Sequence, residues 1–124
     1  MLGNNDVVRV LVVDDNAGLR ETLRELLLSA GYEAETARDG EEAMALHRRR
    51  PFQVLLTDIY MPLSDGLETI QAFRRDAPKM KVIAMSGGGD VAKGSYLGVA
   101  SEIGADATLR KPFEFKKLLE VLKR

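Results

Sequence analysis

The chain has 124 residues, of which 45% are hydrophobic and 30% charged, and its formal net charge is -1. This composition is typical of one globular domain, and the near-neutral charge argues against a strongly basic surface for nucleic acid or an anionic membrane. The absence of cysteine excludes disulfides and zinc–thiolate sites and fits a reducing, cytoplasmic setting. No apolar run approaches the roughly 20 residues of a membrane span, and the polar residues 1–6 predict a frayed tail without a signal peptide.

The first two predicted elements are a strand and a helix. Residues 7–13 are almost continuously apolar and rich in β-branched side chains, which is typical of a strand buried on both faces of a parallel sheet. The run ends at Asp14, Asp15 and Asn16. Apolar residues at helical spacing then predict a helix that ends at Gly31.

The next part of the chain repeats this order. A weaker strand is predicted over residues 32–36, followed by a helix over 41–49 that stops before a proline. Residues 52–57 form the third predicted strand. Asp58 stands at its tip, and Pro62 prevents the strand from continuing.

The second half of the chain continues the alternation. A third helix is predicted to open over Ser64-Asp65-Gly66 and to carry an apolar stripe as far as Phe73. Residues 81–85 predict a fourth strand, which ends at Ser86 before a glycine-rich loop. The remaining predicted elements are a fourth helix over about 94–103, a weak fifth strand over 105–110 that ends at Lys111, and a last helix over 113–123.

Five predicted strands thus alternate with five predicted helices. This order indicates a single doubly wound α/β domain, in which a parallel sheet has helices on both faces. Ligands of such sheets bind outside the carboxyl ends of the strands. The polar groups predicted at this edge are Asp14, Asp15, Asp58, Ser86 and Lys111.

Three carboxylates, a hydroxyl and an ammonium group at one edge indicate phosphoryl-transfer chemistry. Two like charges about 4 Å apart repel by roughly 4 kcal/mol at an effective dielectric of about 20, so the cluster needs a cation. Mg²⁺ suits a few carboxylates together with phosphate oxygens, and Asp14 and Asp15 would hold it beside Asp58. Asp58 would be the nucleophile toward phosphorus, while Lys111 and the Ser86 hydroxyl would contact the transferred group.

Each residue of this set also has a simpler interpretation. Asp14 and Asp15, with Asn16, could cap the first helix. Asp58 could be a turn residue that ends a strand. Ser86 could be an ordinary loop residue and Lys111 a solvated lysine. Together these interpretations require several coincidences at one edge of the sheet, which favours a functional site.

Several spaced motifs resemble the receiver domain of two-component response regulators over essentially the whole chain. They are Val12-Val13-Asp14-Asp15, Leu56-Thr57-Asp58 with Met61-Pro62 and Asp65-Gly66, Ala84-Met85-Ser86, and Gly104-Ala105-Asp106 through Lys111-Pro112-Phe113. The resemblance implies one receiver domain over residues 1–124, with the flavodoxin-like strand order 2-1-3-4-5.

The resemblance also implies a reaction and its partners. A sensor histidine kinase or phosphotransfer protein would donate a phosphoryl group to Asp58, with Mg²⁺ as cofactor. Asp14, Asp15 and Asp58 would bind the metal. It further implies a cis peptide between Lys111 and Pro112.

The resemblance implies a conformational switch in which this chain departs from the family pattern. In the family, a hydroxyl residue moves inward and an aromatic residue of the fifth strand turns, which changes the surface of the fourth helix, fifth strand and fifth helix. Ser86 matches the hydroxyl residue, but Thr108 occupies the aromatic position. Tyr96 is either a substitute for that aromatic or a residue packed on the sheet. The glycine-rich loop after Ser86 is longer than usual for the family and is predicted to be mobile without phosphate.

One further segment and two further residues lie outside this set. Gly89 to Ser95 resembles a phosphate-binding nucleotide loop, but its lysine precedes the second glycine, which argues against nucleotide binding. His47, the single histidine, is predicted to lie on the surface at a helix end. Tyr60 either influences the phosphoryl lifetime or faces solvent without a kinetic role.

Two rival functions are a receiver-like interaction domain that works without phosphorylation and a Mg²⁺-dependent phosphohydrolase. The complete acidic and lysine set argues against the first, and the absence of residues for a substrate cap argues against the second. The expected protein is a signalling domain and not an enzyme, without membrane or direct nucleic-acid contact. Since no DNA-binding segment follows Arg124, we expect either a single-domain regulator or the receiver of a longer protein.

Overall fold

The structure of the protein, a computed structural model, describes residues 7–61, 64–87, 101 and 104–124, with the backbone alone at 60, 61, 64 and 65. The predicted strands form one parallel five-stranded sheet in the order β2-β1-β3-β6-β7, which confirms the expected order 2-1-3-4-5. These strands are β1 (Arg9–Val13), β2 (Glu33–Ala37), β3 (Val54–Asp58), β6 (Lys81–Ser86) and β7 (Ala107–Arg110).

Four helices lie within the described part of the chain. They are α1 (Ala17–Ser29), α2 (Gly40–Arg49), α3 (Gly66–Asp76) and α5 (Phe115–Leu122). The helix expected over 94–103 lies almost entirely outside the described residues, so four of the five expected helices are confirmed. The predicted mobility of the glycine-rich loop, the nucleotide-loop resemblance and Tyr96 also lie outside this part. None of the described helices is long and apolar enough to cross a membrane.

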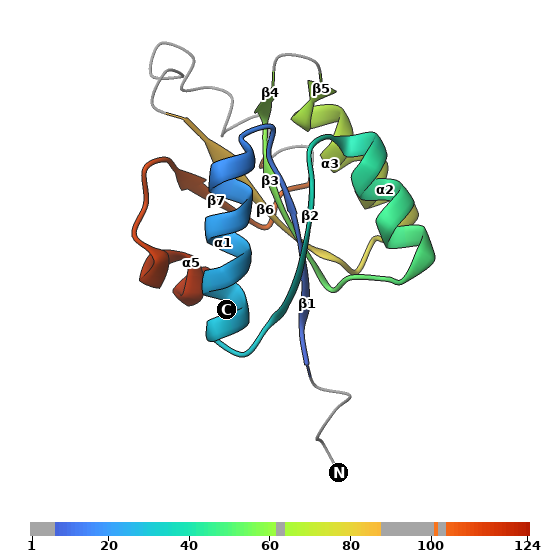
Figure 1. The fold of residues 1–124 in the computed structure, drawn as a ribbon. Helices are drawn as coiled ribbons and strands as arrows, with labels where there is room; N and C mark the ends of the chain where they lie inside the picture. Colours follow the sequence, from blue (N-terminus) through green and yellow to red (C-terminus); the bar gives the residue numbers. More distant parts are fainter. Residues whose placement is uncertain (1–6, 62–63, 88–100, 102–103) are drawn as a thin grey trace.

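The sheet separates two hydrophobic cores. Successive residues of β1 point to opposite faces, as strand geometry requires, so Leu11 and Val13 enter one core while Val10 and Val12 enter the other. The first core is closed by α2 and α3 and the second by α1 and α5 (Figure 1). All five residues of β1 are buried, in agreement with the continuous apolar run of its sequence.

A short hairpin between β3 and α3 was not expected. The strands β4 (Tyr60–Met61) and β5 (Ser64–Asp65) pair antiparallel beyond the carboxyl end of β3 (Figure 1). Each of these strands has two residues, which is too few for an alternating pattern, so the sequence instead predicts residues 64 and 65 as the start of the third helix. The helix instead begins at Gly66.

Gly66 is required by the close approach of α3 to the end of β3. A Cβ atom at this position would lie 2.3 Å from the carbonyl oxygen of Asp58 and 2.3 Å from the Cα of Ile59. These neighbours are backbone atoms and cannot move aside as a flexible side chain could. Any other residue at position 66 would therefore displace the turn that follows Asp58.

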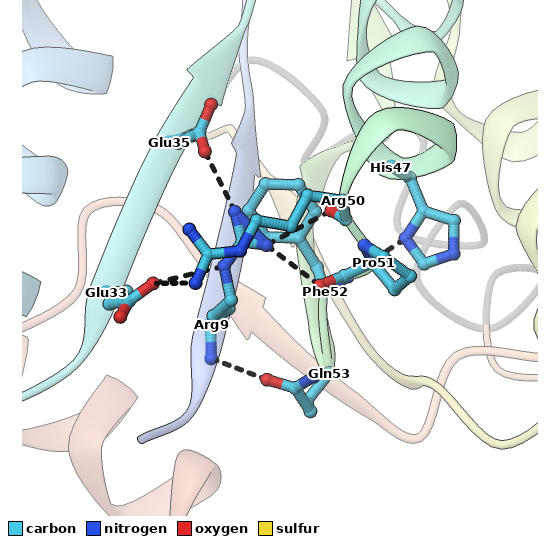
Figure 2. A network of polar contacts seen from close by, with 8 residues as sticks. All are labelled: Arg9, Glu33, Glu35, His47, Arg50, Pro51, Phe52 and Gln53. Atoms are coloured by element: carbon cyan, nitrogen blue, oxygen red, sulfur yellow. Dashed lines mark hydrogen bonds and ion pairs between the residues drawn. The ribbon is translucent and has the colours of Figure 1, made fainter. Parts of the chain in front are cut away.

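The amino edge of the sheet contains a charge cluster that no pattern in the sequence indicates. Arg9 is buried, and its guanidinium lies 3.1 Å from Glu33 and 2.9 Å from Glu35 (Figure 2). It also donates to the carbonyls of Arg50 and Pro51, and it stacks on the ring of Phe52. Arg50 approaches Glu33 at 3.7 Å. We call Arg9, Glu33, Glu35 and Arg50 the Arg9 cluster.

Candidate functional site

The predicted site residues meet at the carboxyl edge of the sheet. Asp14 follows β1, Asp58 ends β3, Ser86 ends β6 and Lys111 follows β7. Asp14 and Asp58 are almost completely buried, with exposures of 1% and 6%, whereas Asp15 is exposed. The parallel topology explains this convergence, because it brings the carboxyl ends of all five strands to the same edge.

Lys111 bridges two of the carboxylates. Its Nζ lies 2.6 Å from Oδ2 of Asp14 and 3.0 Å from Oδ2 of Asp58. Burial of the ammonium group lowers its pKa, but the hydrogen bonds and negative charges of Asp14 and Asp58 outweigh this effect, and the pKa of Lys111 is raised. Lys111 therefore stays protonated, and the interpretation of a merely solvated lysine is wrong.

Asn16, and not the aspartate pair, caps the first helix. Its side-chain oxygen accepts the N–H of Leu19 at 3.0 Å. Oδ1 of Asp14 instead accepts the N–H of Asn16 at 2.9 Å, and Asp15 has no side-chain hydrogen bond or ion pair to any described residue. The capping interpretation thus holds for Asn16 alone, and both aspartates remain at the strand edge.

The three carboxylates are arranged so that they could hold a metal ion. One oxygen from each of Asp14, Asp15 and Asp58 lies within 4.8 Å of the others. Lys111 balances one of the three negative charges, so a surplus of two remains. Hard carboxylate oxygens with such a surplus fit a divalent cation of the Mg²⁺ or Ca²⁺ type. The donor set is therefore chemically suited to the cofactor that the sequence predicts.

The two predicted switch residues lie at different depths in the sheet. Ser86 is buried, and its carbonyl accepts the N–H of Lys111 at 2.7 Å, which ties the end of β6 to the lysine. Thr108 is half-buried and pairs in register with Ala84, two residues before Ser86. Thr108 thus lies within the sheet next to β6, and not at the edge where the carboxylates meet.

Further residues around the site confirm or correct expectations. The peptide between Lys111 and Pro112 is cis, as the resemblance implied. His47 lies in the last turn of α2, as expected, but its ring is half-buried instead of lying free on the surface. Phe52 donates its N–H to Nδ1 of His47 at 3.1 Å, and the ring contacts Phe73 (Figure 2 shows the bond to Phe52). The side chain of Tyr60 lies outside the described residues.

Sequence reasoning missed Arg20, whose guanidinium donates to the carbonyl of Asp14 at 2.7 Å. Its position one turn after the Asn16 cap is the only local signal that could have indicated this contact. An arginine on the first turns of a helix is otherwise an ordinary surface residue.

The sequence and the structure are both similar to those of known proteins. Residues 10–123 match the family model described as response regulator receiver domain. A probable transcriptional regulator, ycf27, of Guillardia theta is 40% identical over 89% of this chain and 42% of its own length. The response regulator MprA of Mycobacterium sp. (strain KMS) is 39% identical over 90% of this chain and 47% of its own. The chain thus spans less than half the length of these two curated relatives.

Solved structures show the same similarity. The chemotaxis response regulator CheY4 of Vibrio cholerae superposes with a TM-score of 0.81 at 32% identity, covering 95% of this chain and 98% of that one. NtrX from Brucella abortus, in complex with ADP, gives a TM-score of 0.86 at 29% identity over 95% of this chain and 26% of that one. With the family match over nearly all of its residues and the aspartates at the predicted edge, this chain belongs to the response regulator receiver domains of two-component signalling.

Proposed function

We propose that Asp58 accepts the phosphoryl group in this receiver domain, and that the donor is a phosphohistidine of a sensor histidine kinase or phosphotransfer protein. The observation that carries the proposal is the environment of Asp58. Its carboxylate is buried at the end of β3, and Oδ2 lies 3.0 Å from Nζ of Lys111. A carboxylate held beside a cation is favoured in the ionised form, which a nucleophile toward phosphorus requires.

The transfer itself exchanges one bond for another. A carboxylate oxygen of Asp58 attacks phosphorus, and the bond from phosphorus to the donor imidazole nitrogen breaks, with its electron pair left on that nitrogen. The product is an acyl phosphate, which water later hydrolyses. Lys111 would contact an oxygen of the transferred group, and the Ser86 hydroxyl would donate a hydrogen bond to another.

Asp14, Asp15 and Asp58 would hold the Mg²⁺ ion. When bound, Mg²⁺ supplies positive charge beside the oxygens of the transferred group. The support for this assignment is the proximity of the three carboxylates and their uncompensated charge. The same three residues explain why the reaction would require metal, because an incoming phosphoryl group adds negative charge to a site that already has a surplus.

The output of the domain would be a change in its partner-binding surface. The face of β7, α5 and the helix predicted over 94–103 would bind a downstream target, with Ser86 and Thr108 as the switch residues. The receiver itself would act in the cytoplasm without contacting nucleic acid.

Intact-mass measurement after incubation with acetyl phosphate tests the proposal. We expect one phosphoryl adduct that requires Mg²⁺, that disappears in Asp58→Asn, and that persists in Asp76→Asn, a matched change at an exposed aspartate on α3. The absence of an adduct, together with no binding of beryllofluoride, would instead favour an interaction domain that works without phosphorylation. Multiple-turnover release of phosphate from a general phosphomonoester would favour a phosphohydrolase.

A further inference from the structure

The loop that carries Asp14 and Asp15 is fixed by contacts that do not involve a metal. The N–H of Asp14 donates to the carbonyl of Ala37 at 3.1 Å, and the two carboxylate oxygens of Asp14 engage Asn16 and Lys111. Only the carbonyl of Asp14 then needs a donor. Arg20 supplies it, with Nη1 2.7 Å from that oxygen.

Arg20 connects this loop to the body of α1. Its own N–H donates to the carbonyl of Asn16 at 3.0 Å, so backbone and side chain of one residue contact both ends of the segment from Asp14 to Asn16. Asp15, between those two ends, has no side-chain hydrogen bond or ion pair to any described residue. The direction of the Asp15 carboxylate therefore depends on how firmly the backbone on either side of it is held.

We propose that Arg20 is a positioning residue for the divalent cation: by holding the Asp14 carbonyl it orients the Asp14 and Asp15 carboxylates toward the ion. The inference rests on the proposed Mg²⁺-dependent phosphorylation and adds a residue that does not touch the metal. Groups that orient metal ligands through hydrogen bonds typically change metal affinity by about 10- to 100-fold when they are removed.

The direction of the change in Mg²⁺ affinity on removing Arg20 distinguishes a positioning role from a simple effect of its charge. A positive charge near the aspartates repels a cation, so if the charge of Arg20 were all that mattered, its removal would strengthen Mg²⁺ binding. If Arg20 positions the ligands, its removal weakens Mg²⁺ binding although a repelling charge is gone. The two interpretations therefore predict opposite changes in the dissociation constant.

The experiment is a calorimetric titration of the metal-free chain with Mg²⁺ at about 10 °C, for the wild type, Arg20→Met, Arg20→Lys and Arg24→Met. We expect the dissociation constant of Arg20→Met to rise about tenfold, and Arg20→Lys to recover part of the loss because lysine can donate to the same carbonyl. Arg24 lies one turn later on α1, is paired with Glu21 and does not contact Asp14, so Arg24→Met removes the same charge as a matched control and should bind Mg²⁺ like the wild type.

A second measurement follows phosphorylation by acetyl phosphate at increasing Mg²⁺. Arg20→Met should require more Mg²⁺ but approach the wild-type rate at saturation. Unchanged or tighter Mg²⁺ binding by Arg20→Met would overturn the inference, and so would an equal loss in Arg24→Met. A wild-type chain that binds no Mg²⁺ and accepts no phosphoryl group would contradict the proposed function itself, which is a different result from either of these.

Discussion

The two edges of the sheet each hold a group of paired charges, but the groups differ in their balance. At the amino edge, the Arg9 cluster combines two cations with two carboxylates, so its formal charge is zero. At the carboxyl edge, Lys111 faces the three aspartates Asp14, Asp15 and Asp58, so the formal charge is −2. Both edges place a cation between two carboxylates, with Arg9 buried and Lys111 half-buried, yet only the carboxyl edge has charge left to balance.

This difference indicates that the charges of the Arg9 cluster stabilise the fold, whereas those at the carboxyl edge are available to bind a ligand. Arg9 donates to two carboxylates and two carbonyls, and its guanidinium covers an aromatic ring, so nothing further is required there (Figure 2). The carboxyl edge is stable only to the extent that Lys111 offsets part of the repulsion among the aspartates. Removal of the central cation should therefore destabilise either edge, whereas removal of one carboxylate should stabilise the carboxyl edge and destabilise the amino edge.

The largest effect is expected for Arg9→Met. This substitution keeps the apolar stem but leaves the carbonyls of Arg50 and Pro51 without their side-chain donor, and it removes the partner of two carboxylates. We expect the free energy of unfolding to fall by about 3 kcal/mol in urea titrations. Arg24→Met, which breaks only an exposed pair with Glu21, should cost less than about 1 kcal/mol. Equal losses in the two variants would show that burial adds nothing to the Arg9 cluster.

The next largest effect is expected for Lys111→Met in the presence of a chelator. Asp14 and Asp58 would then repel each other without a cation between them, and stability should fall by about 2 kcal/mol. Saturating Mg²⁺ should restore more stability to this variant than to the wild type, because the ion takes over the compensation that Lys111 provides. A chelator-treated variant as stable as the wild type would contradict the charge-surplus account.

Asp58→Asn should change the stability of the metal-free domain in the opposite direction from Lys111→Met. It removes one of three clustered negative charges while leaving Asp14 paired to Lys111 at 2.6 Å. We expect the metal-free variant to be more stable than the wild type by about 1 kcal/mol, measured as a higher melting temperature in chelator. A melting temperature below that of the wild type would contradict the argument from crowding.

The smallest effect is a dependence of the unfolding free energy on pH, which is caused by His47 near the amino edge. Burial lowers the pKa of His47, Asp76 opposes this effect and Arg9 adds to it, and the net pKa is lowered. Because the folded state favours the neutral ring, the stability from His47 is fully present above its ordinary pKa and is lost as the pH falls below that value through the lowered pKa of the folded state. The difference in unfolding free energy between the wild type and His47→Asn should therefore shrink between about pH 8 and about pH 5.5. A difference that grows over this range would indicate a raised pKa.

The carboxyl edge could be predicted from the sequence because its signals are local. Continuous apolar runs identify β1, β3 and β6, and each run ends in a polar residue that parallel topology must bring to the same edge. The structure places Asp14, Asp15, Asp58 and Lys111 together there. The positions of these residues at the ends of predicted strands were enough to predict that they meet, and no distance between strands had to be known.

The amino edge could not be predicted in this way. Arg9 stands inside an apolar run, and the hydrogen-bond partners of its guanidinium are between 24 and 42 positions away along the chain. No periodicity indicates that Glu33, Glu35 and the turn at Arg50 will surround it, because that arrangement depends on the packing of β2 and of the α2–β3 turn. The same reason explains why the sequence pattern did not indicate the partial burial of His47, which follows from its contacts with Phe52 and Phe73.

The division of the interior by the sheet has a consequence for how the domain tolerates change. Leu27 and Leu118 pack on one face, whereas Ile70 and Phe73 pack on the other, and none of the buried residues that the structure describes belongs to both cores. Changes in side-chain volume on opposite faces should therefore be nearly additive in free energy. A lineage or a designer can rebuild the face under α2 and α3 without first compensating for it under α1 and α5.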